Sequence, residues 1–285
     1  MPMRFLIPLL FPLLSLICSA QINISLKPSK DQFVAHEPVT AILTITNRAG
    51  KTIRLQGEGR RNWLDINIHS QNGNLLTYSG DPPTYKAVII PAGQTVQKTI
   101  TLSHDYDLTR YGRYRTTAYV KIPNSQESVR SKVSQFTITT GRVLFSQKVG
   151  LPETGNARVY DVIKFNGSQK SEIYVRITND YTKQILSCQA LSPIVNFREP
   201  KAALDRNNHL HLLYMITHTT YVHMVVNPSG QIVKRNFHKQ GALGEPRLEA
   251  FAAGDVKVAG TIPFDPVKER KEALKDRNLS ERPEF

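Results

Sequence analysis

Short runs in which apolar and polar residues alternate follow one another through the first half of this chain. Residues 39–46 (VTAILTIT) and 63–69 (WLDINIH) alternate most regularly, and turn residues such as Asn72 and Gly73 separate these runs. A period of two places every second side chain on one face of a β-strand, whereas an α-helix requires a period of 3.6. Because no helix-period run of useful length interrupts residues 22–140, the pattern predicts an all-β fold with a sandwich in this region.

One segment of this region carries a more specific structural signal. Residues 107–114 (DLTRYGRY) place Gly112 two residues before Tyr114, at the start of a predicted strand. This arrangement is typical of a tyrosine corner, in which the tyrosine hydroxyl bonds to backbone a few residues upstream. Gly112 and Tyr114 are therefore predicted to have a structural role.

The turn and core motifs together resemble those of a known class of domain. Residues 38–47 (PVTAILTITN), 50–53 (GKTI), 90–93 (IPAG) and 112–114 (GRY) look like bacterial immunoglobulin-like domains. The layout of residues 22–140 is similar to the bacterial intracellular proteinase inhibitor family and to macroglobulin-type domains. The resemblance implies an immunoglobulin-like sandwich over residues 21–141. It implies no functional residue, because the inhibitory segment of such a family has no counterpart in this chain.

The second half of the chain, residues 142–264, is predicted to be a separate β-rich domain. Its expected strands lie at residues 143–149, 159–165, 172–177, 184–191, 209–216, 220–226, 231–237, 247–251 and 255–262. A weak repeat of strand, polar turn and longer strand recurs around Ile163, Leu204 and Phe251, at separations of 41 and 47 residues. This spacing is similar to that of propeller blades. Since two and a half copies cannot close a propeller, consecutive hairpins of a sandwich are favoured, and association of chains is the alternative.

The two ends of the chain differ from this β-rich body. Arg4, the apolar run 5–18 and the small residue Ala20 have the order of a secretory signal cleaved after Ala20. The alternatives are an uncleaved membrane anchor and lipidation at Cys18. We expect a secreted or periplasmic protein without a membrane span after cleavage. At the other end, residues 265–285 predict a short, charged, exposed helix that frays into a tail.

Charge and cysteine content limit the partners and the means of stabilisation. The formal net charge is +14, and it is spread: residues 21–141 hold 15 basic and 8 acidic side chains, and residues 142–264 hold 15 and 9. Such a surface favours an anionic envelope polymer, a polysaccharide or an acidic face of another protein, while nucleic acid is not expected of an exported chain. The alternative is that the charge serves solubility alone. Cys188 would be the single cysteine after cleavage, and its apolar surroundings predict a packed residue and no disulfide.

Histidines cluster at His209, His211, His218 and His223, and His209 and His211 with Asp205 are the candidate metal ligands. His209 and His211 share one face of a predicted strand, and Asp205 lies just before it. A pair of imidazoles on one face, with a carboxylate nearby, is what zinc or another divalent metal requires. His223 joins this face only if the following hairpin loop has an odd length. The alternative is a half-exposed polar strand face with no cofactor.

The other sequence motifs do not indicate a catalytic site. Residues 151–155 (LPETG) match a sortase signal, but their internal position favours a turn. Neither a nucleophile elbow nor a phosphate-binding loop is present in the sequence. Exposed aromatic residues can form a binding face, and Trp63 and Tyr111 are the candidates, with core packing of Trp63 as the alternative.

These observations favour an exported, non-enzymatic binding or structural protein that contacts an anionic partner. A carbohydrate-active or metal-dependent enzyme with a site near His209 and His211 is the second hypothesis. Proteinase inhibition by a loop of the first domain, which rests on the resemblance alone, is the third.

Overall fold

The computed structural model confirms an all-β fold. It describes residues 22–57, 62–122, 128–151, 155–168, 170–242 and 244–280, with side chains up to residue 275. The predicted signal segment 1–20, the central residues of the 151–155 motif and residues 281–285 lie outside the described residues. Among the described helices, none has the length and apolar character needed to cross a membrane.

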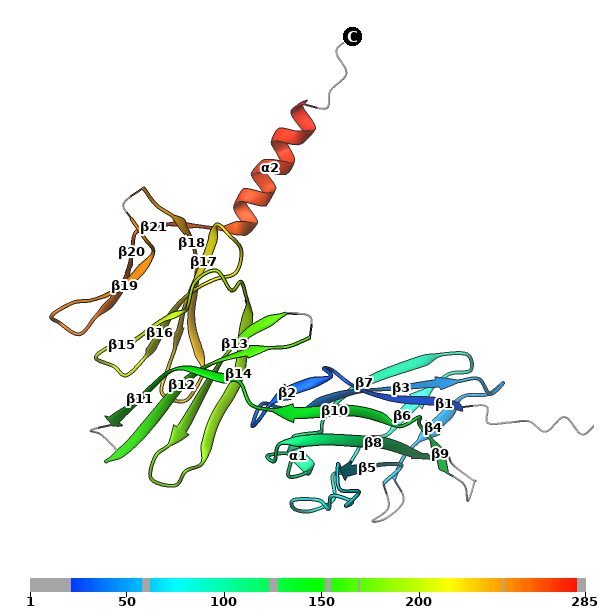
Figure 1. The fold of residues 1–285 in the computed structure, drawn as a ribbon. Coiled ribbons are helices and arrows are strands. Elements are labelled where there is room, and N and C mark those ends of the chain that lie inside the picture. The colour runs from blue at the N-terminus through cyan, green and yellow to red at the C-terminus, as the bar shows by residue number, and fades with distance from the viewer. Residues whose placement is uncertain are drawn as a thin grey trace, which may run out of the picture.

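The N-terminal half consists of two sheets that pack on a shared core (Figure 1). One sheet has the order β1-β3-β7 and the other has the order β2-β10-β8-β5, with β9 beside β8. All pairs are antiparallel except β2 with β10. The bounds are β1 Ile22–Pro28, β2 Gln32–Val34, β3 Thr40–Asn47, β5 Leu64–Ser70, β7 Thr95–Thr101, β8 Gly112–Lys121, β9 Ser128–Arg130 and β10 Ser134–Thr139, with a separate pair β4 Ile53–Leu55 and β6 Val88–Ile90 and the short helix α1 Leu102–Asp105.

The core of this half follows from the alternation in the sequence. Leu43 on β3, Ile66 on β5 and Phe136 on β10 are at most 2% exposed, while their strand neighbours face outward. Trp63 is also buried, at 1% exposed, and its indole N–H donates to the Lys86 carbonyl at 3.1 Å. Full burial of a large apolar side chain stabilises a fold by about 1.5–3 kcal/mol, so these residues hold the two sheets together.

The corner before β8 is fixed by Gly112 and Tyr114. The Tyr114 hydroxyl donates to the Arg110 carbonyl at 2.8 Å, and its ring stacks on Phe136 at a centroid distance of 5.4 Å. Gly112 has a φ of 144°, and a Cβ at this position would lie 3.3 Å from the Gln71 side chain. The corner therefore needs glycine both for its backbone angle and for the close approach of Gln71.

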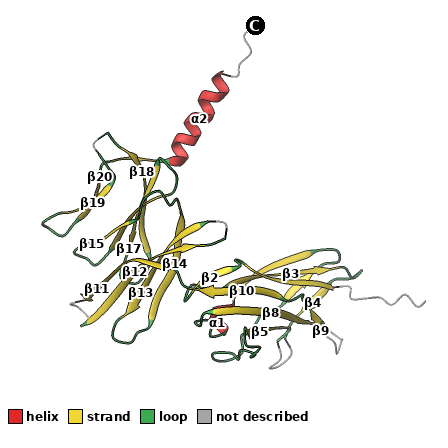
Figure 2. Cartoon of the chain, in the orientation of Figure 1, coloured by secondary structure: helices red, strands yellow, loops and turns green. Residues whose placement is uncertain are grey.

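The C-terminal half is built from successive layers (Figure 2). The first sheet has the order β11-β12-β13-β14, the second has the order β15-β16-β17-β18-β21, and the hairpin β19–β20 forms a third, two-stranded layer. The bounds are β11 Arg142–Leu151, β12 Asn156–Asn166, β13 Ser171–Asn179, β14 Ile185–Ile194, β15 Lys201–Leu204, β16 Leu210–Met215, β17 Thr220–Val226, β18 Ile232–Gln240, β19 Arg247–Ala250, β20 Val256–Ala259 and β21 Thr261–Phe264.

Each boundary between these layers has its own apolar contacts. Tyr160 and Val175 of the first sheet pack against Leu212 and Met224 of the second. The opposite face of the second sheet contributes Leu213, Met215 and Tyr221, which pack against Leu248 and Val258 of the hairpin. Alternation then turns Arg247, Glu249 and Lys257 to the outer side of the hairpin. The division of the chain into domains at residue 141 stays a prediction.

The helix α2, Pro266–Ser280, projects from the C-terminal half (Figure 1). The Asp265 carboxylate accepts the Val267 N–H at 2.8 Å and so caps the first turn. The Lys239 ammonium pairs with Glu269 at 2.5 Å near the base of the helix. Val267 and Leu274 remain more than half exposed, so the described side chains of this helix do not join a core.

We predict that Tyr114→Phe lowers the free energy of unfolding by about 1 kcal/mol, because the Arg110 carbonyl loses its hydrogen-bond donor while the ring stack remains. Urea denaturation of the two proteins measures this difference. Tyr119→Phe on the same strand is the control, since no hydrogen bond of its hydroxyl is found among the described residues, and it should change stability by less than about 0.5 kcal/mol. Equal effects of the two substitutions would contradict the corner's role.

Candidate functional site

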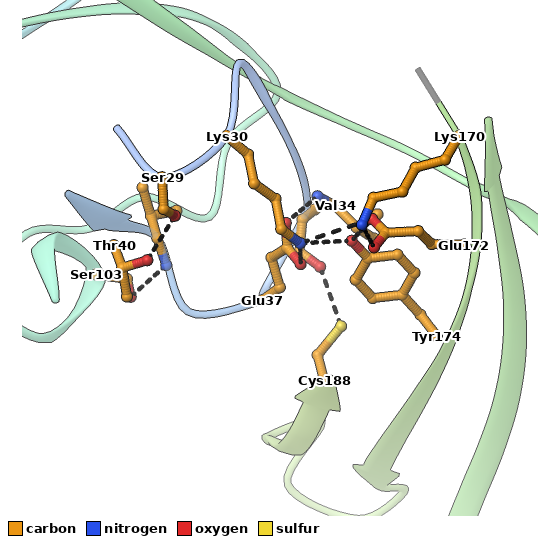
Figure 3. A network of polar contacts seen from close by, with 12 residues as sticks. Ser29, Lys30, Val34, Glu37, Thr40, Ser103, Lys170, Glu172, Tyr174 and Cys188 are labelled. Carbon is orange, nitrogen blue, oxygen red and sulfur yellow. Dashed lines mark hydrogen bonds and ion pairs between the residues drawn. The ribbon is translucent and has the colours of Figure 1, made fainter. Parts of the chain in front are cut away.

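The two halves meet at a cluster of charged side chains centred on Lys30, in the loop between β1 and β2. Figure 3 shows its ammonium group directed at residues of both halves. It donates to Glu37 at 3.1 Å and to the Tyr174 hydroxyl on β13 at 3.0 Å, and it lies 3.8 Å from Glu172. Lys170 pairs with Glu172 at 2.9 Å. Two carboxylates and two ammonium groups therefore balance one another at the contact.

Burial determines the electrostatics of this cluster. Glu37 is 5% exposed, and its desolvation raises the pKa of the carboxyl, although the Lys30 charge acts in the opposite direction. Burial likewise raises the pKa of Tyr174, so its hydroxyl remains protonated and can donate to Glu172 at 3.2 Å. Apolar contacts surround the cluster, since Val34 packs against Ile163 and Phe165 of β12. These contacts fix the halves against each other.

A crevice of about 910 Å³ lies beside this contact. Residues 185–189 of β14 line one wall, and residues 36–38 and 103–109 contribute the others. Cys188 is buried here, and burial raises the pKa of its thiol to about 12. Its Sγ lies 3.6 Å from the Ala35 carbonyl. A thiol of this pKa is protonated at neutral pH, which makes Cys188 a packing residue and not a nucleophile.

The histidines lie on the face of the second sheet that the hairpin β19–β20 covers. Leu213 pairs with His223, and His211 pairs with Val225, so the loop between β16 and β17 places His211 and His223 on one face. The His211 Nδ1 lies 3.0 Å from the His223 Nε2, and the His211 Nε2 lies 3.3 Å from Asp205. His209 also reaches Asp205, at 3.3 Å, whereas His218 is exposed in the turn.

A further histidine, His238 on β18, extends this row. Its ring lies 6.1 Å from that of His223, and its Nδ1 lies 3.0 Å from the Thr261 hydroxyl. His238 lies on the strand after the β16–β17 hairpin, so its place in the row follows only from the register of β18. The Asp205 carboxylate and the rings of His211, His223 and His238 thus form a row across three strands. This row is called the histidine row below.

The predicted zinc site has no support from the geometry of the histidine row and stays a prediction. Within the described residues, no group of three or more His, Cys, Asp or Glu side chains could hold a metal ion. The reason is visible at His211, since one ring nitrogen faces Asp205 and the other faces His223. Asp205, His209 and His211 come together, but as a hydrogen-bonded chain. His211, His223 and His238 are each at most 8% exposed, and burial lowers the pKa of all three.

A second polar surface lies on the outer face of the β2-β10-β8-β5 sheet. A groove of about 530 Å³ is lined by Gln71, Gly112, Arg113, Arg115, Gln135 and Thr137. Arg113 and Arg115 are exposed, and neither guanidinium forms an ion pair with any described residue. The six lining residues, named here the arginine groove, include no carboxylate and no large apolar side chain.

The aromatic binding face predicted from the sequence needs a correction. Trp63 is 1% exposed and belongs to the core. It directly precedes β5, and although alternation would turn it away from the buried Leu64, the Tyr85 ring and the Lys86 carbonyl cover it. Tyr111 is 60% exposed and lies next to Gly112 of the arginine groove. The covering segment is distant in sequence, so the strand pattern alone did not predict this burial.

Comparisons with known proteins give little information on function. No protein-family model matches the chain, and no curated protein matches it significantly. Among solved structures, the sporulation control protein Spo0M from Bacillus subtilis is similar with a TM-score of 0.27 and 10% sequence identity, over 61% of this chain and 91% of that one. This likeness is too low to carry an argument.

We predict that Lys30→Met destabilises the protein by about 2 kcal/mol at neutral pH. The substitution leaves the buried Glu37 carboxylate without its cation, a loss that solvent moderates because the Lys30 side chain is 34% exposed. The loss should be smaller at pH 5 than at pH 8, since protonation of Glu37 removes the uncompensated charge. Urea denaturation at the two pH values checks both points. Lys170→Met, which removes a 56% exposed partner of Glu172, should cost less than about 1 kcal/mol, and an equal cost would contradict the central role of Lys30.

We predict a loss of stability on acidification that originates in the histidine row. Burial, together with the charges of His211, His238 and Lys234, lowers the pKa of His223 from 6.5 to about 4. Below pH 6.5, His223 therefore binds a proton in the unfolded chain but stays neutral in the folded chain. The stability present above pH 6.5 is lost as the pH falls towards 4. His223→Gln should reduce the difference in unfolding free energy between pH 7 and pH 4 by about 2–3 kcal/mol. His218→Gln, in the exposed turn, is the control and should leave the pH dependence unchanged, so an equal effect of both would exclude the row as its source.

Proposed function

We propose that this chain is an exported, non-enzymatic binding protein that contacts an anionic partner through the arginine groove. The observation that carries the proposal is the pair of exposed, unpaired guanidinium groups of Arg113 and Arg115 on one face of a rigid sheet. Some exposed cations elsewhere on the surface are paired with carboxylates, as Arg142 is with Glu199 and Lys148 is with Asp180, whereas neither guanidinium of the groove is. Cations without partners are available to an anionic ligand at no cost of breaking an ion pair.

The scaffold supports this reading. Two sheets around one core, with the tyrosine corner at Tyr114, agree with the immunoglobulin-like sandwich that the sequence resembles. In such folds a binding surface is carried by a rigid framework, and the fold alone does not define the partner. We propose export to the periplasm or the outside of the cell on the basis of the N-terminal signal pattern. An envelope polymer or an acidic polysaccharide would then be accessible to the groove.

The other hypotheses from the sequence have less support. A metal-dependent enzyme would need ligands that converge, and the histidine row does not provide them within the described residues. A proteinase inhibitor would need a reactive loop, and no contact described above favours one. The similarity of the second half to propeller repeats has no support from the comparisons, and we propose the stacked hairpins as its architecture.

We predict that Arg113→Gln combined with Arg115→Gln weakens binding to a polyanion about tenfold or more, because each guanidinium contributes charge-assisted hydrogen bonds worth about 1.5 kcal/mol or more. The measurement is titration calorimetry of residues 21–285 with heparin as a model polyanion, at several salt concentrations. Wild-type affinity should fall as the salt concentration rises.

The matched control removes the same charge from another exposed site of the N-terminal half, through Arg48→Gln combined with Lys51→Gln. This control should retain nearly wild-type affinity. If both double variants lose affinity equally, binding depends on net charge alone and the groove is not the site. If the wild-type protein does not bind heparin at all, the proposed function is wrong for this class of polyanion.

A further inference from the structure

The side chains of the arginine groove form two rows across the sheet. Arg115 lies opposite His69 of β5 on one side and opposite Gln135 of β10 on the other. Arg113 lies opposite Thr137, and the Gln71 side chain reaches its backbone N–H at 3.5 Å. The residues opposite the two arginines are therefore polar and include no carboxylate. Since the two arginines are two residues apart on one strand, their backbones are about 7 Å apart along it.

The neutral groups restrict the chemistry of the ligand. Gln71, Gln135 and Thr137 each offer both a donor and an acceptor, whereas a guanidinium only donates. Phosphate and sulfate oxygens only accept, so the acceptors of the glutamines and the threonine would remain unused against a polyphosphate. A sugar hydroxyl both donates and accepts, and it would use them. Carboxylates and phosphates both match the fork of an arginine in a bidentate pair, so the uncharged side chains, and not the arginines, distinguish the two.

The floor of the groove is formed by Gly112, which has no side chain. A Cβ at Gly112 would lie 3.3 Å from the Gln71 Oε1, so glycine leaves room for the Gln71 amide over the end of β8. The groove volume of about 530 Å³ lies within the range of small-molecule binding sites.

We infer that the ligand of the arginine groove is a carboxylate-bearing polysaccharide, whose acid groups pair with Arg113 and Arg115 and whose hydroxyls bond to Gln71, Gln135 and Thr137. This inference rests on the proposed function, because it names the chemical class of the anion bound at the same site. General attraction of polyanions needs only the two arginines, whereas recognition of this ligand also needs the uncharged side chains of Gln71, Gln135 and Thr137.

The experiment compares four polymers as probes with the protein of residues 21–285: polygalacturonate, polyphosphate, heparin and uncharged dextran. Titration calorimetry at a fixed salt concentration gives the affinity for each. Polygalacturonate should bind at least tenfold more tightly than polyphosphate at equal concentration of charged groups. Dextran should not bind measurably.

The decisive variant is Gln71→Ala combined with Gln135→Ala. It should weaken polygalacturonate binding about tenfold and leave polyphosphate binding within twofold of wild type. Arg113→Gln combined with Arg115→Gln should weaken both. Gln94→Ala combined with Gln97→Ala, at exposed positions at and beside β7 on the other sheet, is the matched control and should change neither. Circular dichroism verifies that each variant is folded.

The outcomes separate the two proposals. If polyphosphate binds as tightly as polygalacturonate and the glutamine variant has no effect, the groove binds anions but the assigned ligand class is wrong. If no polyanion binds, or if the arginine variant binds as wild type does, the proposed function itself fails. Equal loss of polygalacturonate binding in the glutamine variant and its control would also overturn the inference.

Discussion

One ammonium group connects the two halves of this protein. The Lys30 Nζ lies between Glu37, which belongs to its own half, and Glu172 and Tyr174, which belong to the other, and it also lies 5.4 Å from the centre of the Tyr174 ring. Glu37 is held in turn by the Val34 N–H at 3.0 Å, so the charge is anchored to the same strand whose Val34 packs into the second half. An ion pair of this kind specifies geometry more than it adds stability, because desolvation offsets most of its attraction. The orientation of the halves, and hence the crevice between them, depends on it.

The two polar clusters illustrate opposite uses of charge. In the histidine row, burial lowers the pKa of the rings, and the closest pair of rings, His211 and His223 on adjacent strands, lies within hydrogen-bond distance. In the arginine groove, both arginine side chains are exposed, so their hydrogen-bond donors are accessible to a partner. The His238 Nε2 of the histidine row is buried and has no hydrogen-bond partner among the described residues, whereas the arginine groove offers donors to a partner. We therefore base the binding proposal on the arginine groove and not on the histidine row.

Local sequence patterns predicted the strands well, because alternation is a local property. The regular runs at residues 39–46 and 63–69 correspond to β3 and β5, and the segment before Tyr114 supplies the corner hydrogen bond. The site was harder to predict, because it depends on register between strands. Whether His223 joins His211 depends on one residue of loop length, and Trp63, which directly precedes β5, is covered by Tyr85 and Lys86 from a later segment. The contact of Lys30 with Glu172, far apart in sequence, had no local signal at all.

The layered C-terminal half has one further consequence, which concerns how such a chain can change in evolution. Proteins made of stacked units often lengthen by duplication of a unit, since each new copy finds an open apolar face. Here one end of the stack is occupied by Val34 of the N-terminal half, and the other end presents Arg247, Glu249 and Lys257. An additional unit would have to displace the N-terminal half at one end of the stack or pack against the charged side chains at the other end. The number of layers is therefore fixed by what covers the ends and not by the repeat itself.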